Sequence, residues 1–191
     1  MLQFQTTLPP VRRIVTAHDG SGKEIISSDS PMPAQVEILF AKMLIPNAHL
    51  MTHLQCVPQY NVALGKIWVT DSFPSDDNNT EIDGATREIN GISAPKNAAC
   101  LFTDLGPGEE TPMHRTSTID LNVLLSGEVV LVFPDGTRTY LKNPGDTVVQ
   151  RGTNHAWKNI GTTWTRWVTF VIDATPARVN GRELVDVLLT P

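Results

Sequence analysis

The segment MHRTSTIDLNVLLSGE, residues 113–128, decides the fold class of this chain. Apolar side chains occupy every second position from Ile119 to Leu125, which is the two-residue repeat of a β-strand. The opposite face of this strand is polar and carries His114, Thr116, Asp120 and Asn122. Such a polar face meets water in an open sheet, but lines the interior when the sheet closes into a barrel.

A second segment, residues 143–159, repeats this arrangement in NPGDTVVQRGTNHAWKN. His155, Trp157 and Asn159 share one parity, so they point to the same face of an extended chain. The sequence therefore offers two stretches that each place a histidine among polar or aromatic neighbours.

Short β-rich runs and turn sequences alternate through the second half of the chain, a pattern typical of an all-β sandwich or barrel. One turn is Pro134-Asp135-Gly136, whose residue types favour a hairpin. We expect strands at 128–133, 138–141, 147–150 and 164–172. In the first half we expect a hairpin of 11–16 with 24–27, a helix over 34–45, a strand at 66–70 and a polar loop over 74–85.

Composition excludes several classes of protein. The chain has 191 residues, which suits a single domain, and a net charge of -5 without a basic stripe argues against a nucleic-acid partner. The longest apolar stretch is interrupted by Lys42 and is too short to span a bilayer. Cys56 and Cys100 lack metal-site spacing. We therefore expect a cytoplasmic protein that makes no contact with nucleic acid or membrane.

The two segments resemble the two conserved motifs of the cupin superfamily, and the likeness extends over roughly residues 11–175. In the first motif, Gly108, His114 and Gly127 fall in place, while Thr116 and Asp120 replace a histidine and a glutamate. Gly145, Gly152, His155 and Asn159 match the second motif, where Gln150 replaces a proline. The chain is most similar to small fungal and bacterial cupins, and it carries an apparent insertion over residues 36–61.

This resemblance implies a double-stranded β-helix with one or two short peripheral helices, often dimeric. It implies one cupin domain over residues 1–191, with a barrel core at about 62–175 and an arm, 1–61, packed on the barrel or a partner subunit. Cupins commonly hold iron, manganese, nickel or zinc. Here His114, Asp120 and His155 remain as metal-ligand candidates, a set that suits non-haem iron or zinc.

The function expected from this resemblance is acid–base chemistry on a small molecule in secondary metabolism or aromatic catabolism. The reaction would be a decarboxylation, isomerisation, dehydration or cyclisation by a lyase or isomerase. His114 and His155 would act as acid and base with Asp120 orienting them, and Thr116, Asn122, Gln150 and Trp157 would contact substrate. The alternatives are a metal-dependent dioxygenase or decarboxylase, and a non-catalytic binding protein.

Overall fold

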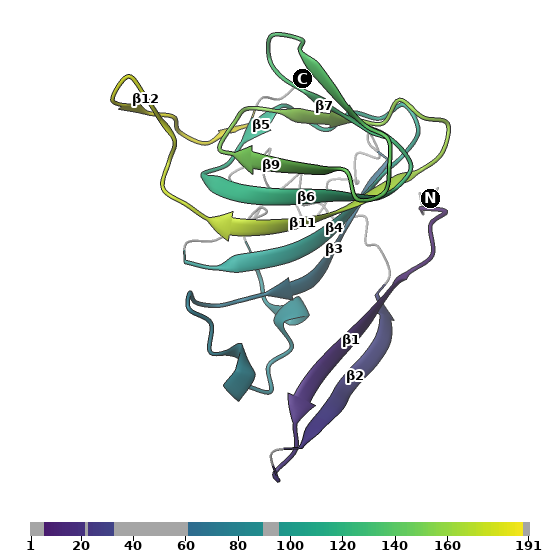
Figure 1. Ribbon diagram of the computed structural model, residues 1–191, viewed down its shortest axis with the longest axis vertical. Helices are drawn as coiled ribbons and strands as arrows, with labels where there is room; N and C mark the ends of the chain where they lie inside the picture. Colours follow the sequence, from purple (N-terminus) through teal and green to yellow (C-terminus); the bar gives the residue numbers. More distant parts are fainter. Residues whose placement is uncertain (1–5, 22, 33–60, 90–95, 189–191) are drawn as a thin grey trace, which may run out of the picture.

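The computed structural model describes residues 6–21, 23–32, 61–89 and 96–188. Within these ranges, strands dominate the fold (Figure 1). The strands are β1 (Val11–His18), β2 (Glu24–Met32), β3 (Val62–Val69), β4 (Ala98–Leu105), β5 (His114–Arg115), β6 (Thr118–Ser126), β7 (Val129–Val132), β8 (Arg138–Leu141), β9 (Thr147–Arg151), β10 (Ala156–Lys158), β11 (Thr165–Asp173), β12 (Arg178–Val179), β13 (Arg182–Glu183) and β14 (Val187–Leu188).

Helical structure in these ranges consists of two three-residue 3-10 helices, η2 (Asp77–Asn79) and η3 (Gly84–Thr86). η2 lies within the polar segment 74–85, for which the sequence predicts a loop, and η3 begins in that segment and ends at Thr86. The helix expected over 34–45 and most of the apparent insertion fall outside the described residues. No described helix is long and apolar enough to cross a membrane.

Two antiparallel sheets form the body of the molecule. The larger has the strand order β3-β4-β11-β6-β9, and the smaller has the order β10-β7-β8. Strand β5 pairs with β14, and an isolated bridge between His114 and His155 connects β5 to β10. These connections join the second sheet to the chain entering β6, which gives the double-stranded β-helix expected from the sequence.

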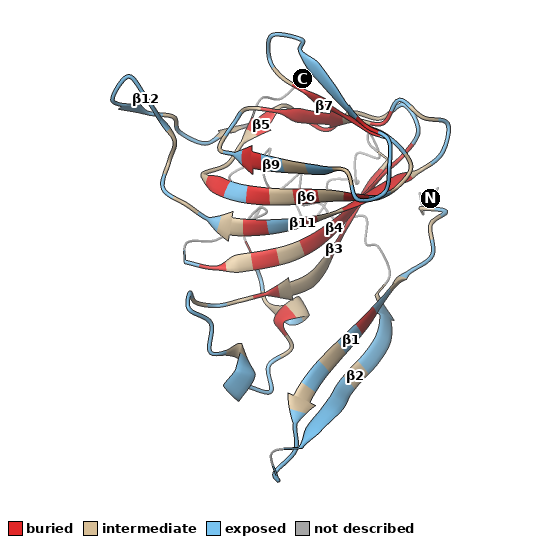
Figure 2. Cartoon of the chain, viewed as in Figure 1, coloured by how far each residue is buried: buried red, intermediate tan, exposed pale blue. Residues whose placement is uncertain are grey.

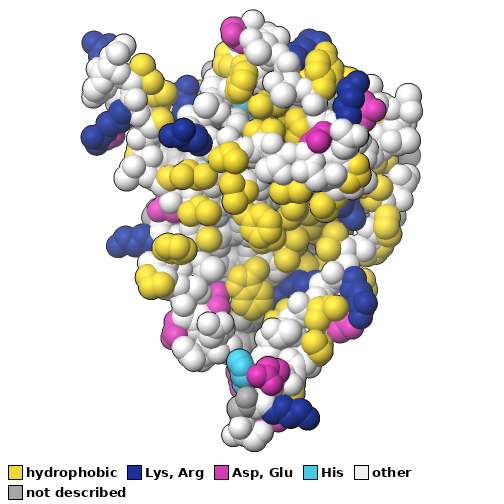
Figure 3. Space-filling view, in the orientation of Figure 1, with side chains coloured by type: hydrophobic (Ala, Val, Ile, Leu, Met, Phe, Trp, Pro, Cys, Tyr) yellow, Lys and Arg dark blue, Asp and Glu magenta, His cyan; other side chains and the backbone are white. Residues whose placement is uncertain are grey.

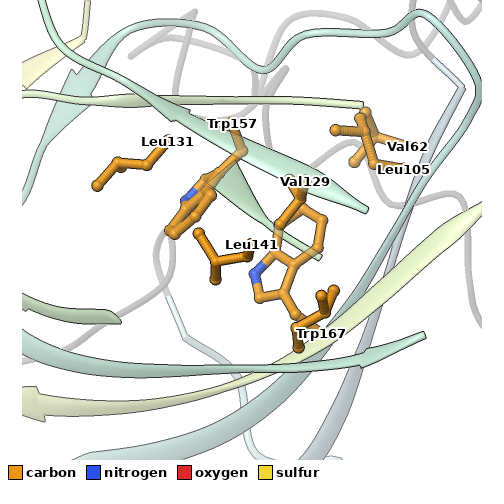
Figure 4. Close-up of a cluster of buried hydrophobic side chains, with 8 residues drawn as sticks. Val62, Leu105, Val129, Leu131, Leu141, Trp157 and Trp167 are labelled. Atoms are coloured by element: carbon orange, nitrogen blue, oxygen red, sulfur yellow. The ribbon is translucent and has the colours of Figure 1, made fainter. Parts of the chain in front are cut away.

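Side chains from both sheets pack together in the core, so the inner surfaces of the two sheets face each other (Figure 4). One cluster of buried side chains combines residues of the five-stranded sheet with residues of the three-stranded sheet. Trp157 and Trp167 meet across this interior, with ring centroids 5.7 Å apart. The members of the cluster are Val62, Leu105, Leu124 and Trp167 from the larger sheet, and Val129, Leu131, Leu141 and Trp157 from the smaller.

Burial alternates along β6, and this alternation settles which face of the strand is inside (Figure 2). Asp120 and Asn122 are buried, whereas Ile119 and Leu125 are 39% and 46% exposed. The polar face therefore lines the barrel interior and the apolar face lies outside. This is the reverse of a sheet whose polar face meets water.

Outward side chains of β6 and β11 form a continuous apolar surface with Val149 of β9 (Figure 3), and Arg151 borders it opposite Ile119. Strand register makes the surface continuous, because Phe170 lies opposite Leu121 and Leu121 lies opposite Val149. We call this surface the outer apolar face. Its members are Ile119, Leu121, Val123, Leu125, Val149, Val168, Phe170 and Ile172.

The β1–β2 hairpin extends beyond the barrel (Figure 1) and is attached to it through Arg13. The Arg13 guanidinium donates to the carbonyl of Ile67 at 2.9 Å, forms an ion pair with Asp83 and lies over the ring of Trp68. Just before the hairpin, the carbonyl of Pro9 accepts a hydrogen bond from Arg166 at 2.8 Å. The first described residues thus cover one end of the larger sheet.

Candidate functional site

A pair of histidines lies at one end of the barrel interior. The backbones of His114 and His155 exchange two hydrogen bonds, 2.8 and 2.9 Å long, across the bridge between β5 and β10. Residues that exchange both bonds in an antiparallel pair project their side chains to the same face. The two imidazole centroids are accordingly 4.3 Å apart, and the side chains are 6% and 2% exposed.

Backbone carbonyls fix the tautomer of both rings. His114 Nδ1 lies 2.9 Å from the carbonyl of Pro112, and His155 Nδ1 lies 3.0 Å from that of Thr153. Because a carbonyl only accepts, each Nδ1 carries the hydrogen, and each neutral ring retains a free lone pair on Nε2. Both rings are therefore prepared to accept a hydrogen bond or a proton at Nε2.

Burial keeps both imidazoles uncharged at neutral pH. Desolvation lowers the pKa of His114, and it lowers the pKa of His155 to about 3 with a further contribution from repulsion by His114. Hydrogen bonds to the two carbonyls act in the opposite direction but are the smaller effect. A second positive charge beside the first is strongly disfavoured at this spacing.

Asp120 is the buried carboxylate of this end of the barrel. It projects inward near the start of β6 and is 3% exposed. Desolvation raises its pKa from the ordinary 3.8 to about 6, although a hydrogen bond from Thr118 opposes the shift. Asp120 thus changes its protonation much closer to neutral pH than an ordinary carboxyl group does, a property suited to general acid–base catalysis.

Two amides lie beside Asp120. Gln150 is directly opposite Asp120 on β9, and Asn122 is the next inward residue on β6. The hydroxyl of Thr169, on β11, donates to Asn122 Oδ1 at 2.8 Å. This bond orients the Asn122 amide, and its other end, Nδ2, has no partner in the part of the chain that the structure describes.

Inward polar residues border the core cluster at one level of the barrel. At three places, an inward polar residue lies two positions along the chain from a member of the core cluster. Register aligns these steps, because Asn122 faces Thr169 and Leu124 faces Trp167. The pairs are Asn122 with Leu124, Thr169 with Trp167, and His155 with Trp157. The titratable groups therefore lie at one end of the interior, between this cluster and a second apolar cluster whose Val171 is opposite Asp120 and whose Leu101 is opposite Thr169.

The structure places the remaining sequence candidates in different surroundings. The Thr116 hydroxyl is half-buried and 2.7 Å from that of Thr118, which in turn contacts Asp120. Trp157 is a member of the apolar core, and its ring meets His155 edge-on at 5.7 Å. Sequence reasoning did not single out Thr118 or Thr169. The alternation within residues 113–128 would have assigned Thr118 to the inward face.

A metal centre needs three or more protein ligands in most proteins. In the ranges that the structure describes, no three His, Cys, Asp or Glu side chains come together as a group that could hold a metal ion. His114 and His155 supply two nitrogen donors, and Asp120 does not complete the set. The described residues thus do not fit the three-ligand metal site suggested by the sequence motif.

Fold and site together define a closed antiparallel barrel with a titratable interior. No protein-family model matches the chain. The chain is 33% identical over 175 residues to phomopsin biosynthesis cluster protein C' of Diaporthe leptostromiformis, covering 90% of this chain and 83% of that protein. It is 30% identical to the cupin-domain-containing oxidoreductase srdD of Neurospora crassa, over 68% of this chain and 70% of the relative.

These relatives show that the chain belongs to the cupin superfamily, as the two motifs indicated. Among solved structures, it is similar to the polyketide cyclase RemF of Streptomyces resistomycificus. The two chains are 17% identical, with a TM-score of 0.43 over 68% of this chain and 72% of the other.

Proposed function

We propose that this cupin is a small-molecule enzyme of secondary metabolism that performs acid–base chemistry at the polar end of its barrel. The observation that carries the proposal is the burial of Asp120 beside two neutral imidazoles, His114 and His155. Perturbed titratable groups in an enclosed site are typical of catalytic centres. The relative in Diaporthe leptostromiformis is named for a biosynthesis cluster, which supports the same metabolic setting.

The pKa directions favour a division of work among the three groups. Asp120, with a pKa raised to about 6, is largely ionised at neutral pH and is the stronger candidate for the general base. The imidazoles stay neutral, so each accepts a hydrogen bond from a substrate hydroxyl at Nε2 and holds a proton only transiently. Isomerisation, dehydration and cyclisation need only such proton transfers.

The test is a screen of purified protein against oxygenated aromatic and polyketide-type compounds, with products analysed by mass spectrometry. We expect a product that has the substrate's mass or lacks one water. The Asp120→Asn variant should lose this activity, and the His18→Ala variant should keep it, because His18 is exposed at the end of β1. Compounds that bind and are returned unchanged would instead support a non-catalytic binding protein.

A second candidate, redox chemistry, is favoured by the name of the Neurospora crassa relative, a cupin-domain-containing oxidoreductase. It predicts a product that has gained oxygen or lost hydrogen, and a requirement for an oxidant. A metal-dependent dioxygenase or decarboxylase would also lose activity with a chelator. Stoichiometric metal in the purified protein, with chelator-sensitive turnover, would replace our proposal with this one.

A further inference from the structure

Three inward polar atoms of β6 and β9 have no hydrogen-bond partner among the described residues. They are Asp120 Oδ1, Asn122 Nδ2 and Gln150 Nε2, and their side chains are 3%, 4% and 3% exposed. Buried polar atoms in folded proteins are nearly always bonded, because an unmade bond leaves the desolvation of the group uncompensated. Two donors and one acceptor are therefore held in place for a ligand.

Strand register sets the arrangement of these atoms. Asp120 and Gln150 face each other across β6 and β9, and yet the acceptor of one does not bond the donor of the other. Both side chains thus direct a free atom elsewhere, on the inward face where Asn122 also lies. Because Thr169 holds Asn122 Oδ1, the Asn122 Nδ2 donor keeps its direction. The pattern is two amide N–H donors next to one carboxylate acceptor.

The charge of this end of the barrel selects among ligands. Among the described residues, the other inward polar side chains of the site are His114, His155, Thr118 and Thr169, and none of these is a lysine or arginine. The apolar Val171 lies opposite Asp120 on β11. The buried arginines Arg13 and Arg166 are paired with Asp83 and Asp104 and attach the N-terminal segment instead. A carboxylate ligand would therefore meet Asp120 with no inward cation from the described residues to offset the repulsion.

Resting on the proposed function, we propose that the substrate is an uncharged ketone or related carbonyl compound with a removable hydrogen on the neighbouring carbon. Its carbonyl oxygen accepts hydrogen bonds from Asn122 Nδ2 and Gln150 Nε2, and that hydrogen faces Asp120 Oδ1. The Asp120 carboxylate also argues against decarboxylation, since a carboxylic acid substrate would enter as an anion and be repelled.

The chemical step is enolisation. Asp120 takes the hydrogen as a proton, the C–H electron pair forms a carbon–carbon double bond, and the carbonyl π pair moves to oxygen. The two amides donate to that oxygen more strongly as it becomes an enolate, which stabilises the transition state more than the ground state. Return of the proton from Asp120 to a different carbon completes an isomerisation with no other reactant.

Two matched probes test the inference. 4-Hydroxyacetophenone carries a neutral methyl ketone, and 4-hydroxybenzoate carries a carboxylate in its place. Binding is followed through quenching of tryptophan fluorescence, since the Trp157 ring contacts His155 at the site. We expect the ketone to bind at least about tenfold more tightly than the carboxylate, as a buried like charge is strongly unfavourable. Asp120→Asn should recover much of the carboxylate affinity.

Variants of the two amides provide the second arm. Asn122→Leu and Gln150→Leu should each weaken ketone binding roughly fivefold, the effect of one neutral hydrogen bond. Asn78→Leu is the control, because Asn78 is exposed in η2. In D2O, the wild type should exchange the methyl hydrogens of the ketone for deuterium, and Asp120→Asn should not.

The outcomes separate the two proposals. Equal affinities for the two probes, including no binding of either, would overturn the inference about the substrate. So would unchanged ketone affinity in both amide variants, with circular dichroism showing that each is folded. Failure of the proposed function has a different signature, namely product formation from the screened compounds that is unaffected by Asp120→Asn.

Discussion

Asp120→Asn should stabilise the folded protein at the same time as it removes activity. Burial raises the pKa of Asp120 from 3.8 to about 6, so the folded state disfavours the ionised carboxylate that the unfolded chain carries at neutral pH. The difference between these two values corresponds to about 3 kcal/mol of folding free energy. Asparagine has the same shape and carries no charge, so the variant is relieved of this cost.

The sign of the pH dependence follows from the raised pKa. Below the pKa of the unfolded chain, Asp120 is protonated in both states and costs the wild type no folding free energy. This advantage is lost as the pH rises through about 6, because the buried carboxyl must then ionise. The gain in the variant should therefore be about 3 kcal/mol at pH 8 and about half of that at pH 5. At pH 8 this corresponds to a rise in Tm of roughly 6–10 °C.

Urea denaturation of both proteins at pH 5 and pH 8 measures this difference without any knowledge of the substrate. Asp135→Asn is the matched control. Asp135 lies in the exposed turn between β7 and β8, where the backbone N–H and the hydroxyl of Thr137 lower its pKa. Its replacement should therefore not stabilise the protein at pH 8. An Asp120→Asn variant that is equally stable as, or less stable than, the wild type at pH 8 would refute the reasoning.

Four further predictions concern the site and its frame. His114→Ala and His155→Ala should abolish turnover in proteins that still fold, and full activity in both would remove the histidines from the mechanism. Turnover of the wild type should rise with pH through about 6, as Asp120 ionises, whereas a profile flat between pH 5 and 8 would contradict its role as base. Asp104→Ala should destabilise the protein by about 3–5 kcal/mol in urea denaturation, because it leaves Arg166 buried without its partner. The control is Asp29→Ala, which breaks the exposed pair with Arg12 and should change stability little. The homodimer expected from the sequence should form through the outer apolar face, which carries no charge and so suits a second copy of itself. Phe170→Glu should then give a monomer in light scattering while Val179→Glu on β12 stays dimeric, and an unchanged mass for Phe170→Glu would exclude this face.

The sequence could not have predicted the full extent of the first barrel strands. Val62, Ala63 and Leu64 at the start of β3 are buried on both faces, and most of β4 is buried as well. A strand covered on both sides lacks the two-residue alternation from which β6 was predicted. The strand at 66–70 was thus assigned too short, because its first residues are covered by chain that is distant in sequence.

By itself, the sequence determined which residues share a face. The alternation in residues 113–128 placed Asp120 and Asn122 opposite Ile119 and Leu125, and the motif spacing associated His114 with His155. What it left open was whether the polar face meets water, because alternation fixes only the relative direction of side chains. Tertiary structure decided this by packing the β10-β7-β8 sheet against that face. The resulting burial raises the pKa of Asp120, keeps both imidazoles neutral and leaves Asn122 Nδ2 and Gln150 Nε2 without partners among the described residues.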